Sequence, residues 1–216
     1  MAKSNPVLGL FFLTGIFLLG CALLPLPSTS VEPAPTFAMP TFSSLPTTPP
    51  EPTTGTGLEN ENLLVEVPAG FKIDYEAKQD NMIINEIVPQ GESVTDWTTM
   101  VTVQIFLGMT ESAPEQYQET LTQSWFNACL NSESNPIASG DENGYNFVVW
   151  QLYCPLNPST QKAEETYFKA IQGNDSFYLV QVAFRHEPSS DEITQWVEYL
   201  KSVQVCDSRI PERVCP

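Results

Sequence analysis

Residues 97–107, WTTMVTVQIFL, predict the fold more clearly than any other stretch of the chain. Apolar or β-branched side chains occupy every odd position, whereas polar Thr98, Thr102 and Gln104 stand at even positions. Successive side chains of a strand point to opposite faces, so this period of two predicts a strand with one buried face. Residues 71–75 alternate in the same way, and residues 82–88 are a further candidate strand.

Two hairpins are expected further along the chain. Asn143-Gly144 is a strong turn signal between residues 137–140 and the apolar run 145–154. A second turn, residues 173–175, joins the candidate strands 163–171 and 176–185.

Helices are expected over residues 112–130 and 191–203. Ser112 and Glu115 have the spacing of a capping box, and Ser189 and Glu192 repeat that spacing. Apolar side chains then recur every three to four residues, which gives each helix one stripe that packs on a sheet. In the first helix these are Tyr117, Leu121, Trp125 and Ala128, and in the second Ile193, Val197 and Leu200.

The order of strands, helix, antiparallel strands and helix predicts one α+β domain with a mainly antiparallel sheet covered by two helices. Over roughly residues 60 to 205 this order resembles the PsbP-like fold, a family of α/β/α sandwich proteins. That family includes extrinsic photosystem proteins and bacterial envelope lipoproteins. The resemblance is architectural and implies no functional residue, because function resides in sites. It is carried by residues 71–75, 97–107, 112–130, 177–184 and 191–203.

The amino end has the pattern of an export signal. Lys3 precedes residues 7–20, an apolar run without charge, so residues 1–20 are expected to be a signal peptide. Leu18-Leu19-Gly20-Cys21 resembles the lipobox of bacterial lipoproteins, in which the cysteine becomes lipidated. We therefore expect a lipid, such as palmitate, on Cys21. The alternatives are an uncut membrane helix over residues 7–25 and an ordinary secretory signal cut further on.

Residues 21–57 are expected to be a disordered tether, because from residue 25 on Pro, Thr and Ser dominate and no apolar periodicity survives. Residues 58–216 then form the single domain. This organisation predicts a location in the bacterial cell envelope, with membrane contact through the lipid anchor. Ala22 after the cysteine favours the outer membrane by family resemblance.

Net charge and the number of cysteines limit which partners and which kinds of site the chain can have. The chain has 26 acidic and 9 basic side chains, a balance that repels nucleic acid and leaves basic proteins as partners. The four cysteines after Cys21 predict two disulfides in an exported domain, and their lack of Cys-x-x-Cys spacing disfavours a metal site. Among the three connectivities we favour Cys129 with Cys154 and Cys206 with Cys215, because the second pair closes a short loop.

No catalytic residue, cofactor site or metal site is expected. His186 is the single histidine, and no Gly-x-Ser-x-Gly motif accompanies it. Glu164 and Glu165 are neighbours on a strand and are expected to point to opposite faces. The acids of 141–144 favour a turn, and those of 191–192 favour a first helical turn. Five aromatic side chains are expected to pack in the core, although they have the chemistry to line a groove: Trp97, Trp125, Phe126, Trp150 and Trp196.

The leading hypothesis is a non-enzymatic envelope lipoprotein that binds or assembles with an envelope protein. The alternative is an envelope hydrolase, which requires a cleft that holds a carboxylate with a raised pKa, or His186 bonded to a serine.

Overall fold

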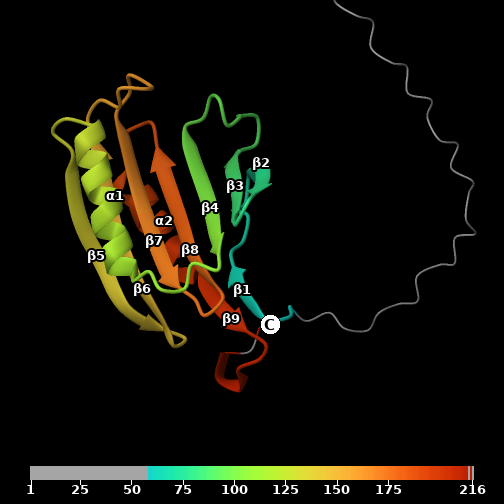
Figure 1. Ribbon diagram of the computed structural model, residues 1–216. Coiled ribbons are helices and arrows are strands. Elements are labelled where there is room, and N and C mark those ends of the chain that lie inside the picture. Colours follow the sequence, from blue (N-terminus) through green and yellow to red (C-terminus); the bar gives the residue numbers. More distant parts are fainter. Residues whose placement is uncertain (1–57, 214, 216) are drawn as a thin grey trace, which may run out of the picture. The chain divides into compact units, whose positions relative to one another are not determined.

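The computed structural model describes residues 58–213 and residue 215. The predicted signal peptide, Cys21 and the predicted tether lie outside the described residues. Among the residues described, no helix is long and apolar enough to cross a membrane. Figure 1 shows the elements, which follow one another as β1 (Glu61–Leu64), β2 (Phe71–Gln79), β3 (Met82–Pro89), β4 (Thr99–Leu107), α1 (Pro114–Ala128), β5 (Glu133–Glu142), β6 (Tyr145–Cys154), β7 (Glu164–Gln172), β8 (Ser176–Phe184), α2 (Ser190–Ser202), β9 (Gln204–Asp207) and the short 3-10 helix η1 (Pro211–Arg213).

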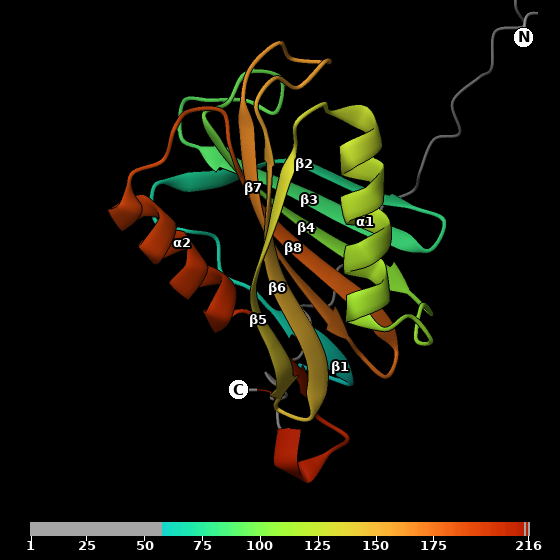
Figure 2. The same cartoon turned by 90° about the vertical axis from the view of Figure 1, so that its left-hand side faces the viewer.

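Seven strands form one antiparallel sheet in the order β2-β3-β4-β8-β7-β6-β5. Helix α1 covers one face of this sheet and helix α2 covers the other, as Figures 1 and 2 show together. The prediction of an α+β domain with a mainly antiparallel sheet between two helices is therefore confirmed.

The sheet is buried on both faces, and its central strands carry apolar side chains at successive positions. On β8, Tyr178 and Val180 face α2, whereas Phe177 and Leu179 face α1. Trp196 and Leu200 of α2 pack on the first face, and Tyr117, Leu121 and Trp125 of α1 pack on the second. Burial of a large apolar side chain contributes roughly 1.5–3 kcal/mol, so two such layers stabilise the domain.

The two helices begin differently. Ser189 caps α2, since its hydroxyl accepts the Glu192 N–H while the Glu192 carboxylate accepts the Ser189 N–H at 3.0 Å. The predicted capping box of α1 is wrong: Ala113 is the N-cap, and no side chain caps it. Pro114 is the first helical residue there and has no N–H to satisfy, so α1 begins without a side-chain acceptor.

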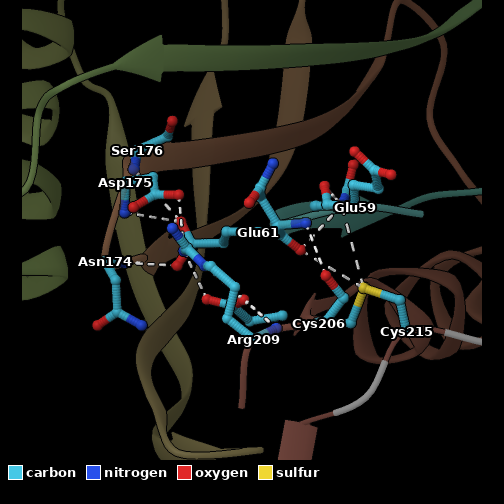
Figure 3. Close-up of polar contacts among 12 residues, drawn as sticks. Glu59, Glu61, Asn174, Asp175, Ser176, Cys206, Arg209 and Cys215 are labelled. Carbon is cyan, nitrogen blue, oxygen red and sulfur yellow. Dashed lines mark hydrogen bonds and ion pairs between the residues drawn. A yellow bond between two sulfur atoms is a disulfide. The ribbon is translucent and has the colours of Figure 1, made fainter. Parts of the chain in front are cut away.

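A second, two-stranded sheet pairs β1 with β9, and neither strand was predicted. Glu61 holds this sheet against the β7–β8 turn, as Figure 3 shows. Its carboxylate accepts the backbone N–H of Asn174 at 2.6 Å, Asp175 at 3.0 Å and Ser176 at 3.3 Å, and also the Tyr178 hydroxyl at 2.9 Å. We call this arrangement the Glu61 clamp.

Two further contacts secure the same end of the domain. Arg209 donates to Asp207 at 2.6 Å and to Asp175 at 2.7 Å, which links β9 to the same turn. The Arg209 guanidinium lowers the pKa of the Asp207 carboxyl. A disulfide joins Cys206 to Cys215, with a Cα–Cα distance of 5.0 Å. The first and last described segments are thereby fixed to each other and to the main sheet.

Candidate functional site

A disulfide braces the end of α1 against the end of β6. It joins Cys129, the residue after the last turn of α1, to Cys154, the last residue of β6, with a Cα–Cα distance of 5.9 Å. Both cysteines are buried. With the pair at Cys206 and Cys215, this gives the connectivity that the cysteine spacing favours. The link fixes the carboxyl end of α1 to the sheet below it.

A groove of about 290 Å³ opens beside this disulfide. Helix α1 supplies one wall through Leu121, Trp125 and Ala128, and the β6–β7 loop supplies the other through Asn157 and Pro158. None of the lining side chains is charged, so the groove offers a mostly apolar surface. We call it the α1 groove.

Two large apolar side chains are exposed beside the disulfide that lines the α1 groove. Leu130 is 86% exposed and Leu156 is 56% exposed. The Cys129 sulfur lies 3.8 Å from the Leu130 carbonyl oxygen and 3.7 Å from the Leu156 carbonyl oxygen, which places both residues next to the disulfide. We call these two residues the apolar rim.

A second hollow, of about 410 Å³, lies where β7 begins and β8 ends. We call it the carboxylate cleft, because Glu164, Glu165 and Glu187 line it together with Tyr153, Ala163 and His186. Glu164 and Glu165 are the first residues of β7 and both line the cleft, but their carboxylates bond to different side chains.

The two carboxylates of β7 have different surroundings. Burial raises the pKa of Glu164, while Arg185 and a hydrogen bond from Asn157 at 3.1 Å oppose that rise. The Glu165 carboxylate accepts the Tyr167 hydroxyl at 2.6 Å and the Gln151 amide at 3.1 Å. Glu164 therefore favours the neutral acid more than an exposed glutamate does, whereas Glu165 is held in place as an acceptor.

His186 lines the same cleft but contacts no serine hydroxyl in the described part of the chain. Its Nε2 lies 3.2 Å from the Glu192 carboxylate, which in turn accepts the Ser189 N–H at 3.0 Å and the Ser189 hydroxyl at 3.1 Å. Glu192 stands between the imidazole and the serine, so the order of groups differs from that of a nucleophilic triad. This arrangement fixes the start of α2.

The aromatic side chains divide between core and surface. Trp97, Trp150 and Trp196 are buried, and the Arg185 guanidinium lies 3.7 Å from the centre of the Trp97 ring. Trp125 packs on the sheet and lines the α1 groove, whereas Phe126 is 40% exposed on the surface of α1. Core packing thus accounts for three of the five, and the two on α1 contribute to a surface.

The remaining acidic candidates take structural positions. Asn143 and Gly144 both have positive φ, 55° and 73°, and form the predicted turn between β5 and β6. Asp191 and Glu192 lie in the first turn of α2. Over residues 58–213 and 215, no group of three or more His, Cys, Asp or Glu side chains is arranged to hold a metal ion.

Sequence reasoning missed both hollows. Leu130, Leu156 and Pro158 lie in segments that follow a helix or a strand, and no periodicity marks such residues as a surface. The spacing of Cys129 and Cys154 was the available signal, since a bridge between them brings the end of the helix to the loop after residue 154.

Comparisons with known proteins give the chain no family. No family model matches the sequence, and no curated protein matches it. The solution structure of the cyanobacterial PsbP of Synechocystis sp. PCC 6803 matches at 9% identity and a TM-score of 0.42, over 70% of this chain and 95% of that one. The Saccharomyces cerevisiae Ran-binding protein Mog1p matches at 11% identity and a TM-score of 0.38, over 66% of this chain and 85% of that one.

A mutant of Mog1 also matches, at 12% identity and a TM-score of 0.40, over 63% of this chain and 78% of the other. PsbP, the family that the order of elements resembles, is thus among the similar structures. Likeness at this level transfers no function, so the α1 groove, the apolar rim and the carboxylate cleft are interpreted from their own chemistry.

Proposed function

We propose that this protein is a lipid-anchored binding or assembly module of the bacterial cell envelope. Cys21 carries the lipid, residues 21–57 form the tether, and residues 58–216 form the domain that binds an envelope protein. The lipobox-like sequence and the composition of the tether support the anchor, and the two disulfides fit an oxidising compartment.

The observation that carries the binding role is the apolar rim. A side chain such as Leu130, 86% exposed, leaves apolar area in water that a partner can remove at roughly 25 cal/mol per Å². Clustered exposed apolar side chains beside a groove are typical of protein interaction sites. The Cys129–Cys154 disulfide holds this surface in shape before a partner arrives, which lowers the entropy lost on binding.

Crosslinking in intact cells tests the binding role. The full-length chain and the double variant Leu130→Ser, Leu156→Ser are crosslinked and recovered, and the crosslinked proteins are identified. We expect a specific envelope protein with the natural chain, and its loss with the double variant. Val67→Ser is the matched control, since Val67 is also exposed but lies outside the apolar rim. Recovery that is the same with all three chains would contradict the proposal.

The anchor is tested separately by metabolic labelling. We expect labelled palmitate to enter the natural chain and to be lost in Cys21→Ala, and mass spectrometry to find a mature chain that begins at Cys21. A mature chain that retains residues 1–20, or one that begins well downstream, would refute lipidation at this position.

An envelope hydrolase is a second candidate, and the carboxylate cleft is the observation that favours it. Glu164 lies in a hollow, and burial raises its pKa, as a general acid requires. Turnover of a cell-wall substrate by the purified domain, with complete loss in Glu164→Gln, would support this role. Turnover that Glu164→Gln leaves unchanged would remove it.

A further inference from the structure

The α1 groove and the carboxylate cleft lie side by side. Asn157 contacts both hollows: it lines the groove, and its Nδ2 donates to the carboxylate of Glu164 in the cleft at 3.1 Å. The β6–β7 loop, which carries Asn157 and Pro158, is therefore the partition between an apolar hollow and an acidic one. A ligand long enough to cross this loop would contact both.

The charge at this end of the domain is negative. Glu164, Glu165 and Glu187 line the cleft, and the positive side chains nearest in sequence are Lys162 and Arg185. Arg185 stacks on Trp97, with its guanidinium 3.7 Å from the ring centre, and its charge also acts on Glu164, so the three carboxylates outnumber this nearby cation.

Basic side chains elsewhere in the described residues are mostly engaged with a carboxylate or a ring. Lys72, Lys169, Lys201 and Arg209 each form an ion pair with an acidic side chain, and Arg213 lies 4.4 Å from the centre of the Tyr145 ring. Most acidic side chains of residues 58–213 are at least partly exposed, so the surface of this part of the chain is acidic. Such a surface attracts a cationic partner over distance and repels an anionic one.

We propose that the α1 groove and the carboxylate cleft together bind one segment of a partner protein, in which an apolar side chain is followed within a few residues by lysine or arginine. The apolar side chain enters the groove between Trp125 and Pro158, and the cationic group pairs with Glu164 and Glu187 across the loop. This inference rests on the proposed binding function and specifies the chemistry of the partner.

Two other occupants fit the charges less well. A second copy of this chain would bring two acidic surfaces together, and an anionic membrane would meet the carboxylates directly. A basic and apolar protein segment satisfies the groove and the cleft at once. Self-association and vesicle binding are therefore outcomes of the test that would count against this proposal.

Short synthetic peptides test it with the purified full-length chain. One peptide series pairs leucine with arginine at varied spacing, a second pairs leucine with glutamate, and a third pairs serine with arginine. We expect the first series to contain a binder by fluorescence anisotropy. The other two series should bind the protein about tenfold more weakly or not at all, because the leucine–glutamate peptides lack the ion pair and the serine–arginine peptides lack the apolar contact. Binding should weaken as salt is raised toward about 0.5 M, since the ion pairs are partly exposed.

Variants of the protein test where each of the two contacts is made. Ala128→Gln fills the groove and should weaken the leucine contact. Glu187→Gln should weaken binding of the leucine–arginine peptide several-fold, because it removes a charge pair, and should not weaken binding of the leucine–glutamate peptide, because there it removes a repelling charge. Glu187 is exposed, so this variant does not depend on core packing. Glu66→Gln, at an exposed position outside both hollows, is the matched control and should bind like the natural domain.

The proposal is overturned by no binding of any leucine–arginine peptide up to about 1 mM, which corresponds to a negligible affinity. It is also overturned by equal binding of all three series, by binding to anionic vesicles alone, or by self-association that covers the groove. If crosslinking to an envelope protein still depends on Leu130 and Leu156 while the peptides fail, the binding function stands and only the partner chemistry is wrong.

Discussion

Removal of the Cys129–Cys154 disulfide should destabilise the domain more than removal of Cys206–Cys215. The first bridge closes a loop of 25 residues and the second a loop of 9. The chain-entropy relation then gives about 3.5 kcal/mol for the first and about 2.6 kcal/mol for the second. The two losses should therefore differ by about 0.9 kcal/mol, because all four cysteines are buried and alanine leaves a similar void at each.

Equilibrium unfolding in urea measures both losses. The double variants Cys129→Ala, Cys154→Ala and Cys206→Ala, Cys215→Ala are compared with the natural domain, with tryptophan fluorescence and circular dichroism as probes. We also expect a steeper dependence on urea in both variants, since an unlinked unfolded chain exposes more surface. A larger loss from the Cys206–Cys215 variant, or no loss from either, would refute the entropic reasoning.

Three other perturbations have expected outcomes. Leu200→Ala should cost about 2–5 kcal/mol in thermal or urea unfolding, because Leu200 is fully buried on the side of α2 that packs on the sheet; a cost below about 1 kcal/mol would contradict the packing. Glu164→Gln should stabilise the domain at neutral pH. Burial raises the pKa of Glu164 in the folded state, so its charged form opposes folding above that pKa. The difference in the free energy of unfolding between the variant and the natural domain should vanish as the pH falls below the pKa of an unfolded glutamate. A difference that does not depend on pH would refute this reasoning. Glu61→Gln should cost about 1–3 kcal/mol and speed hydrogen exchange of the Asn174 and Ser176 amides, whereas Glu59→Gln should leave that exchange unchanged.

Much of the fold was predictable because period and turn chemistry are local signals. The alternation in residues 97–107 identified β4, although the strand begins at Thr99 and the buried Trp97 precedes it. Asn143-Gly144 identified the β5–β6 hairpin because both residues have the positive φ that this turn requires. The Ser189–Glu192 spacing identified the start of α2 because it too is a local signal: the two partners are three residues apart.

What sequence reasoning missed depends on contacts between distant residues. β1 and β9 are four residues each, too short for a period to be recognised, and they pair across the whole length of the domain, while Glu61 contacts a turn more than 110 residues away. That Glu164 and Glu165 both line one cleft depends on their place at the start of β7. Similarly, Ser112 and Glu115 had the capping spacing, but the chain enters α1 through Ala113 and Pro114 instead.

The Glu61 clamp and the carboxylate cleft lie at opposite ends of β7. It holds the β7–β8 turn, at one end of β7, whereas Glu164 begins β7 at the other end. Nine residues of strand span about 30 Å, and Figure 1 shows β1 and β9 together at the clamp end. A fluorescent protein or affinity tag fused after Cys215 would thus lie at the end of the domain away from the β6–β7 loop. That loop would stay accessible to a partner protein.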